Sequence, residues 1–174
     1  AFLLSCIIFR SMYEERTYRN LVKTDDLVTF QVIVKETDLL IRAAKDISRE
    51  ARESVLKYRH QIETYIERNP PFQGSLSPLR DDPYAPGIIR EMIRTSQVAQ
   101  VGPMAAVAGA MAESVSRDLL ELSQEVIVEN GGDIYLATSR ERTIGIYAGS
   151  SPLSLKLGIV LQPEDTPLGI CTSS

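Results

Sequence analysis

The sequence has little of the material from which nucleic-acid sites and imidazole-based catalytic sites are built. There is no tryptophan, and only 6% of the 174 residues are aromatic, so few rings could stack on bases. The net charge of −4 also argues against a general nucleic-acid partner. The single histidine, His60, lies beside Arg59 and Gln61 in a charged segment. A solvated position is therefore favoured for His60, and a Ser-His-Asp triad is not expected.

Cysteines and long apolar runs are also scarce. Cys6 and Cys171 are too few and too far apart for a disulfide framework or a zinc site, which indicates a reduced, cytoplasmic setting. The apolar residues 1–9 fall short of the roughly 20 residues that a membrane span needs. Residues 3–6 look superficially like a lipoprotein processing box, but they lack the basic segment and longer apolar region of a real signal. We expect no membrane partner.

Hydrophobic periodicity predicts an α+β fold in one domain, residues 1–174. Apolar residues alternate over 28–34, and a second strand at 39–42 completes an antiparallel hairpin. A period of three and four marks an amphipathic helix from about Asp46 to the residues before Asn69. Segregated strands and helices indicate a mixed or antiparallel sheet with packed helices. Later elements are a non-helical connection over 70–87, helices beginning at Pro86 and Pro103, and strands at 143–147, 157–161 and 168–171.

The most informative segment is 126–136, in which two apolar runs flank Glu129, Asn130, two glycines and Asp133. Adjacent glycines allow positive φ and a close backbone approach. Two carboxylates and an amide around one tight turn suit Mg²⁺, or the hydroxyls and ring nitrogens of a nucleotide-like ligand. The alternative is an ordinary β-hairpin with polar tips.

A second notable segment, residues 101–113, is dominated by glycine, alanine and proline. Such a slim helix lets another group come close. One interpretation is that its start, at Gly102 and Met104, faces an anionic ligand. The other is a central helix packed tightly against a sheet, and the two interpretations are compatible.

The chain resembles an uncharacterised prokaryotic family related to the ApbE-like proteins, the FAD:protein FMN transferases. The resemblance rests on residues 13–19, 34–38, 58–59, 102–109 and 129–133, and on Cys171 to Ser173. It implies an ApbE-like fold with FAD or FMN and Mg²⁺ as cofactors. Gly131, Gly132 and Asp133 match the turn that lines the flavin site of the transferases. Gly109 and Glu113 match a glycine and an acid on their preceding helix, and Thr172 and Ser173 match their Thr-Ser-Gly segment.

The sequence also departs from the transferases. Ala108 stands where they have a lysine, and their downstream His-x-x-Asp-Pro-x-Thr-Gly motif, which supplies Mg²⁺ ligands, has no counterpart before Ser174. The chain therefore resembles a C-terminally incomplete member. The expected ligand-binding residues are Gly102, Met104, Gly109, Asn130, Gly131, Gly132, Asp133, Thr172 and Ser173, with Glu129 and Asp133 as metal ligands.

Three functions follow from this combination. The leading hypothesis is binding of a small anionic nucleotide- or flavin-like molecule. The second is a Mg²⁺-dependent flavin or phosphoryl transferase or hydrolase. The third is a non-catalytic assembly domain, in which the small-residue helix makes a contact within a homo-oligomer.

Overall fold

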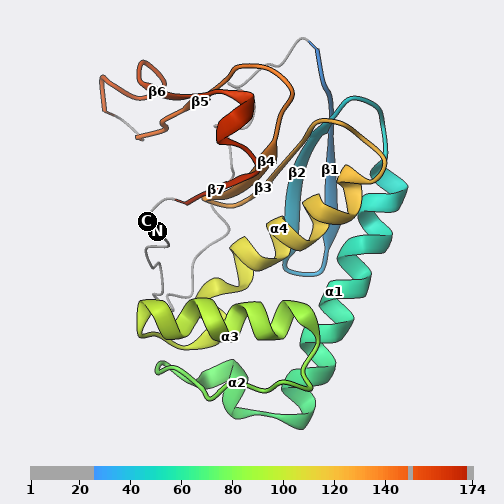
Figure 1. Cartoon of the computed structure of the whole chain (residues 1–174), viewed down its shortest axis with the longest axis vertical. Coiled ribbons are helices and arrows are strands. Elements are labelled where there is room, and N and C mark those ends of the chain that lie inside the picture. The colour runs from blue at the N-terminus through green and yellow to red at the C-terminus, as the bar shows by residue number, and fades with distance from the viewer. Residues whose placement is uncertain (1–25, 149–150, 172–174) are drawn as a thin grey trace.

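A five-stranded antiparallel sheet forms the centre of the protein (Figure 1). The computed structural model describes residues 26–148 and 151–171, so the predictions for residues 1–25, Thr172 and Ser173 lie outside the described residues. The strand order is β1-β2-β3-β4-β7, and each neighbouring pair is antiparallel. The strands are β1 (Val28–Val34), β2 (Thr37–Ala43), β3 (Val126–Asn130), β4 (Asp133–Ala137) and β7 (Leu168–Ile170). The α+β prediction is confirmed.

Alternation along each strand gives the sheet two different faces. The face toward the helices, the helix face, carries side chains that belong to the main core, among them Val32, Ile41 and Val128. The opposite face, the outer face, carries Ile127 and Leu136 of a second, smaller cluster. The sheet therefore separates two cores of unequal size.

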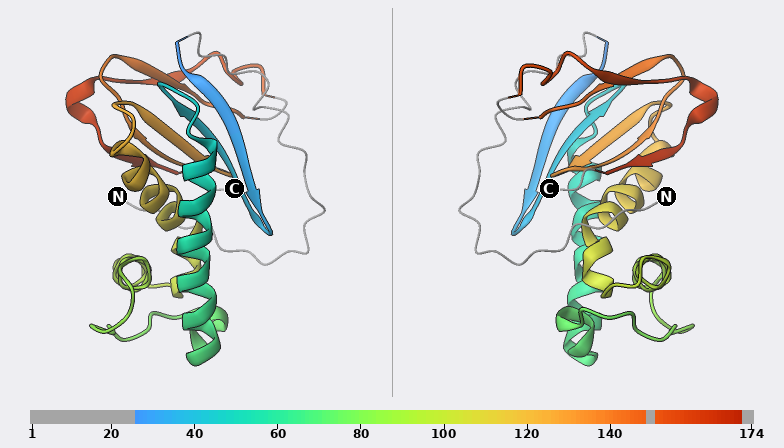
Figure 2. Two further views of the ribbon diagram at one scale, coloured as in Figure 1. Left: turned by 90° about the vertical axis from the view of Figure 1, so that its right-hand side faces the viewer. Right: turned by 90° about the vertical axis from the view of Figure 1, so that its left-hand side faces the viewer.

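The helices pack on the helix face of the sheet and around one another (Figure 2). They are α1 (Ser48–Arg68), α2 (Pro71–Gly74), α3 (Gly87–Ala99), the 3₁₀ helix η2 (Pro103–Ala106) and α4 (Val107–Leu120). α1 contacts β1, and α4 contacts β3 and β4, whereas α3 packs against α1, η2 and α4. None of the helices in the described part of the chain is long and apolar enough to cross a membrane.

Two helix predictions need correction. The connection over residues 70–87 contains the short helix α2, because Phe72 is completely buried and meets the Tyr65 ring edge-on at 5.1 Å. The burial of the Phe72 ring is a tertiary contact, which the hydrophobic periodicity of the sequence does not reveal. The third helix does begin at Pro103, but as the 3₁₀ turn η2, and the α-helix starts only at Val107.

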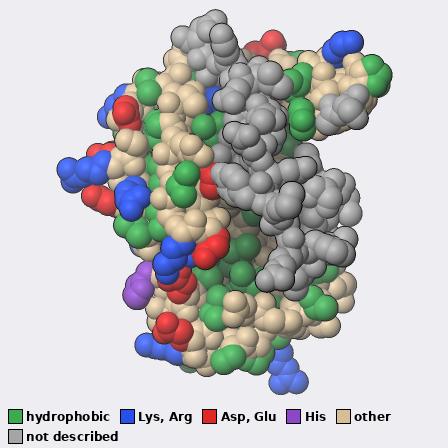
Figure 3. Space-filling view, turned by 180° about the vertical axis from the view of Figure 1, so that it is seen from behind, with side chains coloured by type: hydrophobic (Ala, Val, Ile, Leu, Met, Phe, Trp, Pro, Cys, Tyr) green, Lys and Arg blue, Asp and Glu red, His purple; other side chains and the backbone are tan. Residues whose placement is uncertain are grey.

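A two-stranded extension, the β5–β6 arm (residues 142–148 and 151–161), projects beyond the central sheet (Figure 1). It pairs β5 (Arg142–Gly145) with β6 (Gly158–Leu161), and the 3₁₀ helix η3 (Pro163–Asp165) leads from it to β7. Seen from behind, the arm carries hydrophobic side chains on its surface (Figure 3).

Buried Glu125 anchors the base of this arm. Its carboxylate accepts hydrogen bonds from Ser139, from Arg142 and, at 3.2 Å, from Arg140 Nε. Arg142 also pairs with Asp26 at 2.8 Å. Burial alone would raise the pKa of Glu125, but the hydrogen bonds from Ser139 and Arg142 outweigh burial and hold that pKa below its usual value of 4.5.

Glu125→Gln should therefore destabilise the protein by about 1.5–3 kcal/mol at neutral pH, because charge-assisted hydrogen bonds are lost. The folded-state pKa is lowered, so the stabilisation is present above the usual value of 4.5 and disappears as the pH falls through the folded-state pKa. Urea unfolding across this pH range measures it. Exposed Glu121→Gln is the control, and equal stability of the two variants would contradict the anchoring role.

Candidate ligand site

The predicted site is centred on the β3–β4 turn, which is only two residues long. Gly131 and Gly132 alone connect Asn130 with Asp133, which pair directly across the two strands. Gly131 has φ of 69°, a left-handed conformation that side chains with a Cβ rarely adopt. The segment is thus a β-hairpin with polar tips, and the two glycines set its register.

This turn meets the first turn of α4. Asn130 Nδ2 donates a hydrogen bond to the Ala108 carbonyl oxygen at 3.1 Å, and the Gly109 backbone acts on the Asp133 carboxylate by lowering its pKa. Gly109 is the third residue of α4, and an N–H in that position has no acceptor within its own helix. The hairpin is therefore docked on the start of α4 through Asn130, with the Asp133 carboxylate near the N–H groups of the first turn.

Asp133 is a carboxylate in a partly dehydrated position. Burial raises its pKa above the usual value of 3.8, and the backbone of Gly109 offsets only part of this effect. Its neighbours Val107, Ala108 and Gly109 of α4 and Gly131 of the turn are half-exposed.

Glu129 lies on the other side of the sheet from Asp133. Glu129 pairs with Leu40 on one side and Ile134 on the other, and it shares the outer face with Ile127. Successive side chains in a strand point to opposite faces, so the hairpin does not bring the two predicted metal ligands together. Within residues 26–148 and 151–171, no group of three or more His, Cys, Asp or Glu side chains is placed to hold a metal ion.

Gly102 lies upstream, in contact with a different segment. It is buried at the start of η2, and a Cβ added to it would lie 1.7 Å from the Ser75 carbonyl oxygen. Met104 is half-buried and packs against the main core. The structure therefore brings Gly109, Asn130, Gly131 and Asp133 together, and places Gly102 and Met104 on the preceding 3₁₀ turn.

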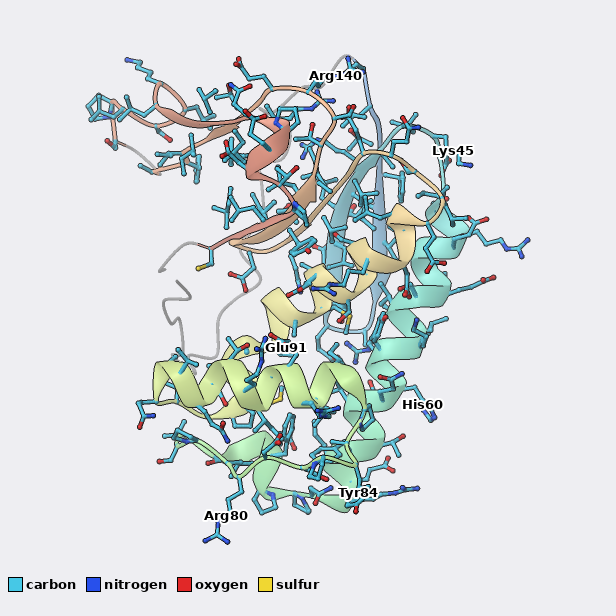
Figure 4. All side chains as sticks on the ribbon, viewed as in Figure 1. Lys45, His60, Arg80, Tyr84, Glu91 and Arg140 are labelled. Carbon is cyan, nitrogen blue, oxygen red and sulfur yellow. The ribbon has the colours of Figure 1, made fainter. Side chains whose placement is uncertain are left out.

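His60 is exposed on α1 and points away from the protein, as its sequence context predicts (Figure 4). The sequence did not predict the polar cluster between α1 and α4, where Asp118 accepts from Ser54 and Lys57 at 2.6 Å and from Tyr58 at 3.0 Å. Burial alone would lower the pKa of Lys57, but the Asp118 and Tyr58 oxygens outweigh it and raise that pKa. Lys57 therefore stays protonated and serves as a structural tie. The available signal was the spacing of three polar residues on one face of α1.

Gly102→Ala should destabilise the protein by about 1–3 kcal/mol or more, because the new methyl group meets backbone that must move. Gly87→Ala is the matched control, since a Cβ at Gly87 has nothing within 4 Å. Denaturant melts compare the two variants, and a harmless Gly102→Ala would show that the contact with Ser75 is not tight in solution.

Asp133→Asn removes the charge while keeping the size of the side chain. The folded-state pKa of Asp133 is raised, so its favourable contribution is present below 3.8 and is lost as the pH rises through the folded-state pKa. We expect Asp133→Asn to melt above the wild type at neutral pH, with the difference vanishing in acid. Asp133→Ala removes the charge as well, so its stability difference from the wild type should show the same pH dependence. A difference independent of pH would refute this account.

Comparison with known proteins identifies relatives over most of the chain. A protein-family model described as AbpE bacteria matches residues 19–174. The chain is 40% identical over 147 residues to the UPF0280 protein MJ1526 of Methanocaldococcus jannaschii, which covers 83% of this chain and 59% of that protein. It is 39% identical over 153 residues to a UPF0280 protein of Methanococcus vannielii, covering 86% and 62%. The matched stretch thus spans less than two thirds of these relatives.

The family match includes both strands of the β3–β4 hairpin and the whole of α4, the elements that form the site. This extent is enough to assign the family without any statement about activity. The chain belongs to the AbpE bacteria family, an ApbE-related family.

Proposed function

We propose that the chain binds a small anionic nucleotide- or flavin-like molecule at the start of α4 and the adjoining Gly131-Gly132 turn. The observation that carries this proposal is the contact between the β3–β4 turn and the first turn of α4, where Asn130 Nδ2 donates to the Ala108 carbonyl oxygen at 3.1 Å. This contact brings the half-exposed polar residues Asn130 and Asp133 to a helix N-terminus, where backbone N–H groups and the helix dipole favour negative charge.

The resemblance to the FAD:protein FMN transferases supports the same surface. Gly131, Gly132 and Asp133 match the transferases' flavin-lining turn, and Gly109 matches their helix glycine. In this proposal Asp133 and Asn130 recognise the polar ring or ribose of the ligand. Gly102 and Met104, together with Thr172 and Ser173, complete the expected binding residues.

Turnover is the weaker alternative. Transfer or hydrolysis of a phosphoryl group would need a metal to neutralise developing charge, and Glu129 and Asp133 project from opposite faces of the sheet. We therefore propose binding without a Mg²⁺ centre formed by these two residues. The proposal also includes a cytoplasmic location, the absence of a nucleic-acid partner and a possible homo-oligomer. No activity of the longer family proteins is assigned to this chain.

Thermal unfolding against FAD, FMN and ATP, with and without Mg²⁺, tests this function. A ligand at 100 times its Kd stabilises the folded state by about 2.7 kcal/mol, which raises the Tm by roughly 5–10 °C for a chain of this size. We expect a shift with at least one of these ligands in the absence of Mg²⁺. A shift that requires Mg²⁺ would favour the transferase alternative, and no shift with any of them would refute the proposal.

Variants then locate the binding surface. Asp133→Ala and Asn130→Ala should each reduce the ligand-induced shift, measured from the unliganded Tm of the same variant. Asp81→Ala, an exposed aspartate in the connection before α3, is the control and should leave the shift intact. Equal shifts in all three variants would place the ligand elsewhere.

A further inference from the structure

The β5–β6 arm has one apolar face that is left in solvent. Arg142 pairs with Leu161 and Ile144 with Ile159, and beyond β5 the N–H of Ile146 bonds to the Leu157 carbonyl oxygen at 2.9 Å. Residues directly opposite one another point to the same face. One face of the arm therefore carries Ile144, Ile146, Leu157, Ile159 and Leu161, with Arg142 at its base, where it pairs with Glu125 and Asp26.

Exposure increases along this face away from the body of the protein. Leu161 is 5% exposed, Ile159 is 44% exposed and Leu157 is 53% exposed. The opposite face has fewer apolar side chains: it carries Thr143, two glycines and Val160, which is 55% exposed. Lys156 is the single charged residue between 143 and 161. The higher number of apolar side chains on the first face is typical of a sheet that is packed on one face, and a contiguous exposed apolar surface marks an interaction site.

The apolar face of the arm is continuous with the second core. Leu161 belongs to the buried cluster on the outer face of the central sheet, together with Ile127 and Leu136, and Ile144 packs against that cluster. This row of apolar side chains thus begins inside the second core and becomes exposed toward the far end of the arm. We expect other apolar groups to cover an exposed surface that continues a core, because exposed apolar area costs about 25 cal/mol for each Å².

The length of the relatives indicates where such a cover could come from. The matched stretch spans 59% of the Methanocaldococcus jannaschii protein and 62% of the Methanococcus vannielii protein. About two fifths of each relative therefore lies outside the match. A cover within one polypeptide does not depend on protein concentration, whereas a cover supplied by a second copy does.

We propose that, in full-length members of the family, the polypeptide outside the matched stretch packs on the apolar face of the β5–β6 arm and extends the second core. The cover is an uncharged apolar segment, because Arg142 at the base of the face is already paired with Glu125 and Asp26 and the rest of the face is apolar. Two-stranded sheets are marginally stable alone, so the arm gains order from this contact. The proposal is independent of any ligand at α4.

Hydrogen–deuterium exchange tests it in this 174-residue chain and in the full-length Methanocaldococcus jannaschii relative. The arm should exchange at least tenfold more slowly in the relative, while the β1–β2 hairpin, as an internal reference, exchanges equally in both. Ile159→Asp should leave the Tm of this chain almost unchanged, since the side chain is already in solvent. The corresponding change in the relative should lower its Tm by several degrees.

Thr143→Asp, on the opposite face, is the matched control and should be tolerated in both proteins. Equally fast exchange of the arm in both proteins would overturn the proposal. It would also be overturned if the relative tolerated the change that corresponds to Ile159→Asp. A dimer of this chain that Ile159→Asp dissociates in sedimentation would identify a second copy as the occupant instead.

Discussion

The register of the β3–β4 hairpin is the constraint on which the site and both cores depend. Because the turn holds only Gly131 and Gly132, Asn130 must lie opposite Asp133, and every later pair follows from that one. Val128 and Tyr135 then face the helices, whereas Ile127 and Leu136 face outward. A slip by one residue would exchange these sets and remove Asp133 from α4.

The two faces of the sheet differ in how far other elements cover them. The helix face is covered by α1 and α4, and its core contains fully buried side chains such as Leu39, Ile41 and Val128. The outer face has the smaller cluster, and its apolar row continues along an arm held at its base by Glu125 and Arg142. The charged anchor fixes the direction of the arm while leaving its apolar face uncovered. The larger, fully packed core and the partly exposed apolar row therefore lie on opposite sides of one sheet.

Patterns within a single element were readable from the sequence, and contacts between elements were not. Alternation over 28–34 predicted β1, and the three-and-four period predicted α1, because each pattern reflects one local geometry. The α2 turn depends on the buried ring of Phe72, and the anchor joins Asp26 to Arg142 across 116 positions. Glu129 and Asp133 were grouped by closeness along the chain, but the alternation of strand side chains separates them.

The Asp133 carboxylate at the start of α4 also limits what kind of ligand the proposed surface can bind. Because a carboxylate already lies at this helix start, an incoming phosphate there must displace it or bind elsewhere. Under the proposed function, Asn130 and Asp133 therefore contact a polar ring or ribose of the ligand, and its phosphate lies away from Asp133.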